Sequence, residues 1–133
     1  MDLNIRIIHA RDFLITTPTL QVDLETSKQF FLKLARENAA PRQYDLLIDL
    51  RRTTGNLSLS EVTEVVKVVI DHRDSFRSRI AILTTPGVKF ENAQFGALYA
   101  TNRGFQMAAF TDFEETINWL MSSSKAPSEG GAL

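Results

Sequence analysis

Residues 44–69, YDLLIDLRRTTGNLSLSEVTEVVKVV, decide the fold of this chain. Residues 46–48 are consecutive apolar residues, and such a run is typical of a central strand covered on both faces. Valines at positions 62, 65, 66 and 69 have the spacing of one helix face. Ser58 and Glu61 fit a capping box that begins this helix. The stretch therefore predicts a buried strand, a loop with two arginines and an amphipathic helix.

The residues before this unit predict a hairpin and a helix. A period of two over residues 3–9 and a β-branched apolar run over 13–17 predict two strands joined by a turn at 10–12. Pro18 ends the second strand, because proline cannot donate to a strand ladder. Asp23 is the expected N-cap of a helix that reaches about residue 38, and Pro41 blocks its continuation.

The residues after the unit continue the alternation of strands and helices. Strands are expected over 79–83 and 105–110, with a helix between them over 91–103 that stops at Gly104. A second capping box, from Thr111 to Glu114, is expected to open a short last helix.

The complete order, β-β-α-β-α-β-α-β-α, predicts an α/β fold with a mainly parallel sheet and an N-terminal antiparallel hairpin. Residues 1–121 form one domain on this interpretation. Residues 122–133, SSSKAPSEGGAL, are small and polar and are predicted to be a disordered tail.

Composition excludes several classes of function. The 133 residues carry a net charge of −1, which argues against a broad nucleic-acid surface. There is no cysteine, and His9 and His72 lack the spacing of metal ligands, so neither a metal nor another cofactor is expected. No apolar run approaches the length of about 20 residues that a membrane helix needs, and the first residues do not form a secretory signal. We expect a soluble cytoplasmic protein.

Three segments carry a family resemblance: LLIDLR at 46–51, SFRSRIAILTT at 75–85 and NRGFQMAAFTDFEETINWL at 102–120. Together they resemble the STAS domain of anti-sigma-factor antagonists, in its SpoIIAA-like branch, which is distantly related in shape to CRAL-TRIO lipid-binding domains. The resemblance spans residues 3–121. It implies the α/β fold described above and a regulatory or protein-interaction role.

The chain departs from that family at one functional stretch. Regulatory STAS domains carry an Asp-Ser-Ser/Thr-Gly stretch at the start of the helix after the central strand, where a kinase phosphorylates a serine. Residues 56–61 here read NLSLSE, so Ser58 and Ser60 lie near the modified position but the Asp and Gly are missing. Ser58 and Ser60 are therefore candidate phosphosites, and the alternative is that Ser58 is only a helix cap.

The loop after the central strand is the candidate partner-binding or anion-binding site, because ligands of parallel sheets often bind beyond the strand ends. Arg51 and Arg52 lie beside a helix N-terminus and suit a phosphate or a carboxylate. Alternatively, one arginine pairs with Asp49 or Asp112 and the other faces solvent. The candidate set is Asp49, Arg51, Arg52, Thr54, Gly55 and Ser58, with Gly55 allowing the loop to bend.

A second candidate site is an apolar pocket beside the third helix, with the lining Phe90, Phe95, Leu98 and Tyr99. The same residues would suit a core-facing or dimer-facing stripe. Two functions follow. The first is a non-enzymatic interaction module that binds a protein partner or itself as a homodimer. The alternative is a carrier of a lipid or another small apolar molecule. Catalysis is not expected, since Asp49 has no visible nucleophile or base beside it in the sequence.

Overall fold

The computed structural model describes residues 7–10, 13–18, 21–38 and 44–122. In these ranges the elements are β1 (Ile7–Ala10), β2 (Phe13–Thr16), α1 (Leu24–Glu37), β3 (Asp45–Asp49), α2 (Leu59–Asp71), the short 3₁₀ helix η1 (Arg73–Ser75), β4 (Arg79–Leu83), α3 (Val88–Thr101), β5 (Gln106–Phe110) and α4 (Phe113–Met121). The expected α/β fold is confirmed. Positions 3–6 of the expected first strand, two positions of the turn at 10–12, Pro41 and residues 123–133 lie outside the described residues.

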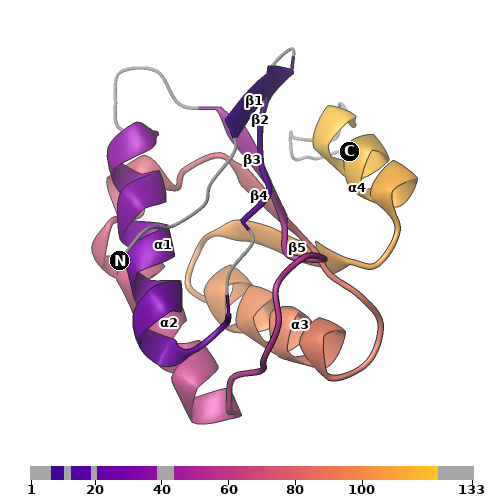
Figure 1. Cartoon of the computed structure of the whole chain (residues 1–133). Coiled ribbons are helices and arrows are strands. Elements are labelled where there is room, and N and C mark those ends of the chain that lie inside the picture. The colour runs from indigo at the N-terminus through magenta and orange to yellow at the C-terminus, as the bar shows by residue number, and fades with distance from the viewer. Residues whose placement is uncertain (1–6, 11–12, 19–20, 39–43, 123–133) are drawn as a thin grey trace.

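The strands form one sheet in the order β1-β2-β3-β4-β5, which is the order of the chain (Figure 1). Strands β2 to β5 pair in parallel, and β1 pairs antiparallel with β2, with Ile8 opposite Ile15. Strand β3 lies at the centre, with Leu46 beside Ile80 of β4 in the parallel register. The continuous apolar run of β3 is thus explained, because residues 46–48 are fully buried between neighbours on both edges and layers on both faces.

Helices α1, α2 and α3 cover one face of the sheet (Figure 1). This follows from the strand order. Right-handed crossovers that add each new strand on the same side place every connecting helix on the same face. The core of this layer joins the valine face of α2 to the side chains of Phe30 and Leu34 on α1 and of Ile48 and Ile80 on the sheet.

Helix α4 packs on the opposite face, where it joins a smaller core (Figure 1). Leu120 of α4 packs with Leu47, Ala81 and Leu83 of the central strands, and Trp119 adds its ring at the edge. Among the described helices only α4, the short helix after the last strand, covers this face.

The helix starts test the capping predictions. Asp23 and Ser58 are the N-caps of α1 and α2, as expected, and Ser58 and Glu61 form the complete capping box. The predicted box at Thr111 and Glu114 is wrong by one residue: Asp112 is the N-cap and accepts a 2.9 Å hydrogen bond from the Glu115 amide. Helix α3 begins at Val88, three residues before the expected start, after an N-cap glycine that has no side chain to reveal it.

Candidate functional site

The loop between β3 and α2, residues 50–58, lies against the segment before α1. Thr54 forms an isolated parallel bridge with Gln21, and its carbonyl accepts a 2.6 Å hydrogen bond from the Val22 amide. Gly55 has a φ of 87°, and a Cβ atom built there would lie 2.8 Å from the Val22 carbonyl oxygen. Only glycine satisfies both demands, so Gly55 shapes the loop as well as letting it bend.

Arg51 and Asp49 form a closed pair at the start of this loop. The Asp49 carboxylate accepts bonds of 3.0 Å from Arg51 Nε and 2.9 Å from Nη2, and a third bond of 3.0 Å from the Arg51 amide. The hydrogen bond with Asp49 raises the pKa of the Arg51 guanidinium above its usual value. The guanidinium also lies 5.9 Å from the centre of the Phe113 ring. The Arg51 guanidinium is therefore already paired within the protein. This matches the alternative in which one of the two arginines pairs with Asp49.

The other residues of the predicted loop site face solvent. Arg52, Thr54, Ser58 and Ser60 are exposed, and within the described residues Arg52 has neither an ion pair nor a hydrogen bond. Ser58 Oγ accepts from the Glu61 amide at 3.2 Å and lies 3.2 Å from Ser60 Oγ. The structure thus gives Ser58 a capping role and leaves its hydroxyl accessible at the first turn of α2.

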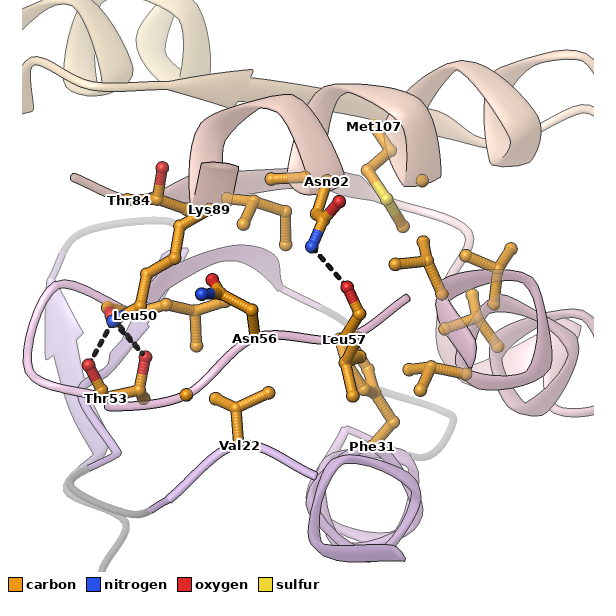
Figure 2. Close-up of a pocket in the computed structure, with 18 residues that line it drawn as sticks. Val22, Phe31, Leu50, Thr53, Asn56, Leu57, Thr84, Lys89, Asn92 and Met107 are labelled. Carbon is orange, nitrogen blue, oxygen red and sulfur yellow. Dashed lines mark hydrogen bonds between the residues drawn. The ribbon is translucent and has the colours of Figure 1, made fainter. Parts of the chain in front are cut away.

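A cavity of about 120 Å³ lies beneath this loop, between the sheet and its helix layer (Figure 2). Its floor is Ile82 of β4 and Met107 of β5. One wall is the valine face of α2, and another consists of Lys89, Asn92, Ala93 and Gly96 of α3. Val22 and Phe31 close the side toward α1.

Five loop residues line the same cavity: Leu50, Thr53, Gly55, Asn56 and Leu57. The order of the five described strands never reverses along the sheet, so these strands form no topological switch point at which a crevice would open between strand ends. The hollow lies under the loop instead.

The residues expected to line an apolar pocket, Phe90, Phe95, Leu98 and Tyr99, do not line this cavity. Leu98 is 60% exposed, and Phe95 and Tyr99 lie beside each other at the flank of the core, with ring centres 6.4 Å apart. The Arg103 guanidinium lies 3.6 Å from the centre of the Tyr99 ring. The small residues of α3 face the core, whereas Phe95 and Tyr99 lie at its edge. The cavity therefore lies on a different side of α3 from the one expected.

Polar groups gather where the loop meets α3. Lys89 Nζ donates to the carbonyl oxygen of Thr53 and, at 3.2 Å, to its hydroxyl. Asn92 Nδ2 donates to the Leu57 carbonyl at 2.7 Å. Two side chains of α3 thus hold the loop over the cavity (Figure 2). Lys89 and Asn92 carry no signal in the sequence, because the loop they hold lies more than 30 residues before them in the chain.

No protein-family model and no curated protein matches the chain. A solved structure does match it: an uncharacterized protein from the DUF3478 family with a SpoIIAA-like fold, from Shewanella loihica PV-4. The two chains share 21% sequence identity with a TM-score of 0.58, and the match covers 89% of this chain and 93% of that one. The SpoIIAA-like fold expected from the sequence is thereby confirmed. None of the helices in the described ranges is long and apolar enough to cross a membrane.

Proposed function

We propose that this SpoIIAA-like domain is a non-catalytic binding module, that the β3–α2 loop is its working element, and that it binds a small apolar molecule in the cavity beneath that loop. The observation that carries the proposal is the shared surface: five of the nine loop residues line the cavity. An occupant would touch the loop from below and change the surface that the loop presents above.

The size of the cavity supports a small ligand over a long lipid. An apolar cavity of about 150 Å³ holds benzene in another protein, whereas drug-sized ligands occupy pockets of about 300 to 1,000 Å³. The cavity here, at about 120 Å³, matches the first class. A long acyl chain would have to displace the valine face of α2, which is part of the core.

The absence of catalysis is part of the proposal, and the state of Asp49 supports it. A general base needs a free carboxylate within reach of the proton that it removes. The Asp49 side chain is only 10% exposed, and both of its oxygens accept hydrogen bonds from Arg51.

Methyl NMR with toluene as a neutral apolar probe tests the binding role. We expect toluene to shift the methyl signals of Val62 and Val66, which line the cavity. Ala93→Leu should abolish the shifts by filling the space between α3 and α2. Leu98→Ala is the matched control on the same helix, because Leu98 is exposed and does not line the cavity. Unshifted valine methyls at saturating toluene, or equal shifts in Ala93→Leu, would contradict the proposal.

A second candidate function is protein interaction at the outer surface of the same loop, including self-association as a homodimer. The specific observation is that Arg52 is exposed and unpaired within the described residues, in the same loop as the exposed Ser58, with the exposed Ser60 following in the first turn of α2. Sedimentation of the wild type and of Arg52→Glu tests self-association. A dimer that dissociates in the variant supports this candidate, and a monomeric wild type removes the homodimer from it.

A further inference from the structure

We infer that the ligand of the cavity is a small apolar monocarboxylate, whose carboxylate group binds the Lys89 ammonium where the loop meets α3. The inference rests on the proposed apolar-ligand function and names the chemical class of that ligand. Its basis is the placement of one lysine against a cavity whose other walls are mainly aliphatic (Figure 2).

The Lys89 side chain lines the cavity, and its ammonium group, which lies against Thr53 of the loop, is incompletely used. An ammonium group has three N–H donors. Two of them are accounted for by the carbonyl and hydroxyl oxygens of Thr53, both on the loop side. The third donor has no partner within the described residues, and a carboxylate oxygen at the cavity's edge would supply one.

The charge of Lys89 is also unbalanced. The ion pairs among the described residues are Lys28–Glu64, Arg51–Asp49 and Arg77–Asp74, and none of them includes Lys89. A partly buried cation without a counter-ion is unfavourable, because burial removes part of its hydration. An anionic ligand would restore the balance.

The position of Lys89 in α3 strengthens this argument. Lys89 is in the first turn of the helix, where the macrodipole favours an anion and disfavours a cation. The acidic residue of that turn, Glu91, is exposed and two positions away, a spacing at which side chains on a helix do not face each other. The N-cap residue, Gly87, has no side chain that could accept a hydrogen bond from the first turn.

A neutral donor lies at the same end of the cavity. Figure 2 shows the Asn56 amide turned toward the Lys89 side chain. Its amide group makes no hydrogen bond within the described residues, so its two N–H donors are available to a second carboxylate oxygen. Thr84 is less suited to this role, because its hydroxyl already donates to the Thr85 carbonyl at 2.9 Å.

The volume of the cavity limits the size of the ligand's apolar part. A cavity of about 120 Å³ accommodates a phenyl ring or a short alkyl chain. Phenylacetate has such an apolar part and one carboxylate, and phenylacetamide has nearly the same shape without the charge. This pair separates recognition of the charge from burial of the ring.

Methyl NMR titrations with both compounds test the inference. In the wild type we expect phenylacetate to bind about tenfold more tightly than phenylacetamide, the difference that one charge-assisted hydrogen bond can provide. Lys89→Met keeps most of the side-chain volume and removes the charge, so the ratio of the two affinities should fall to about one. Lys89→Arg should retain the preference. Lys67→Met is the matched control, since Lys67 is exposed on α2 and should leave the ratio unchanged.

The outcomes separate this inference from the function on which it rests. Equal binding of the two compounds by the wild type, or a carboxylate preference that survives in Lys89→Met, overturns the inference and leaves the apolar-ligand function standing. If toluene, phenylacetamide and phenylacetate all leave the valine methyls unshifted, the proposed function itself fails. A change in loop structure in Lys89→Met would alter both affinities, so the ratio and its recovery in Lys89→Arg are the deciding quantities.

Discussion

Arg79 caps the end of the helix that contains Trp119. The Arg79 side chain is buried, and its Nη1 donates to the carbonyl oxygen of Trp119, to that of Ser122 at 3.2 Å and to the Ser122 hydroxyl at 2.8 Å. The guanidinium also lies 5.4 Å from the centre of the indole ring. A residue at the start of β4 thus donates to carbonyl groups at the end of α4, where the Trp119 carbonyl also accepts a 3.3 Å hydrogen bond from the Ser122 amide.

Replacing Arg79 should therefore loosen α4. We expect Arg79→Met to lower the free energy of unfolding by about 2 to 3 kcal/mol, the usual loss when a buried charged donor is removed from several acceptors. Trp119 is the single tryptophan of the chain, so its fluorescence reports on α4 directly. Urea unfolding monitored by this signal gives the measurement. An unchanged midpoint would contradict the capping role of Arg79.

Gly55→Ala should destabilise the β3–α2 loop by about 1 to 3 kcal/mol, because it combines a positive φ with a collision against the Val22 carbonyl. Gly104→Ala is the matched control. Gly104 also has a positive φ, 96°, but its nearest neighbour is the flexible end of Arg73 at 3.4 Å. Urea unfolding of both variants should show the larger loss for Gly55→Ala. Equal losses would mean that the approach of the loop to Val22 adds nothing.

The pair of Arg51 and Asp49 should contribute about 1 kcal/mol to stability, a value reduced because the Arg51 side chain is 43% exposed. A double-mutant cycle with Arg51→Ala and Asp49→Asn measures the coupling between the two residues. Arg52→Ala should leave stability unchanged, since Arg52 makes no ion pair within the described ranges. A coupling near zero would show that the closed geometry brings no stability.

Stability should also depend on pH through the cap of α1. Hydrogen bonds from the Thr26 amide and then the Thr26 hydroxyl lower the pKa of Asp23 below its ordinary value of 3.8. A carboxyl group whose pKa is lowered by folding stabilises the protein above its unfolded pKa, and this stabilisation is lost as the pH falls through the folded pKa.

Asp23→Ala should accordingly be less stable than the wild type at pH 7. The difference in stability between the two proteins should become smaller below pH 3.8. Thermal unfolding of both proteins across that range gives the comparison. A difference that stays constant from pH 7 to pH 2 would assign the effect to something other than the charged cap.

The helix starts show what the sequence can predict. Asp23 and Ser58 were identified because their own side chains make the capping bonds. Gly87 has no side chain, and the start of α3 was accordingly missed by three residues. At α4 the spacing of Thr111 and Glu114 predicted a cap one residue too early, because the backbone geometry makes Asp112 the N-cap.

The position of the cavity could not be predicted from the spacing of residues in the sequence. The four-residue spacing of Phe95 and Tyr99 suited a pocket lining, a core-facing stripe or a dimer-facing stripe. In the structure, Gly96, Ala97 and Ala100 face inward, and their small size lets α3 approach α2 and the sheet closely. Which face of α3 packs inward depends on residues from several elements, and so does the hollow that results.

The agreement of strand order with chain order has a consequence for synthesis on the ribosome. Each parallel strand after β2 pairs with a strand that has already emerged, so the sheet can grow without waiting for a distant partner. The face beneath α4 is the exception, because its cover follows all five strands. We expect nascent chains that end before residue 113 to expose Leu47, Ala81 and Leu83 to chaperones. Crosslinking of stalled nascent chains to chaperones would detect this exposure.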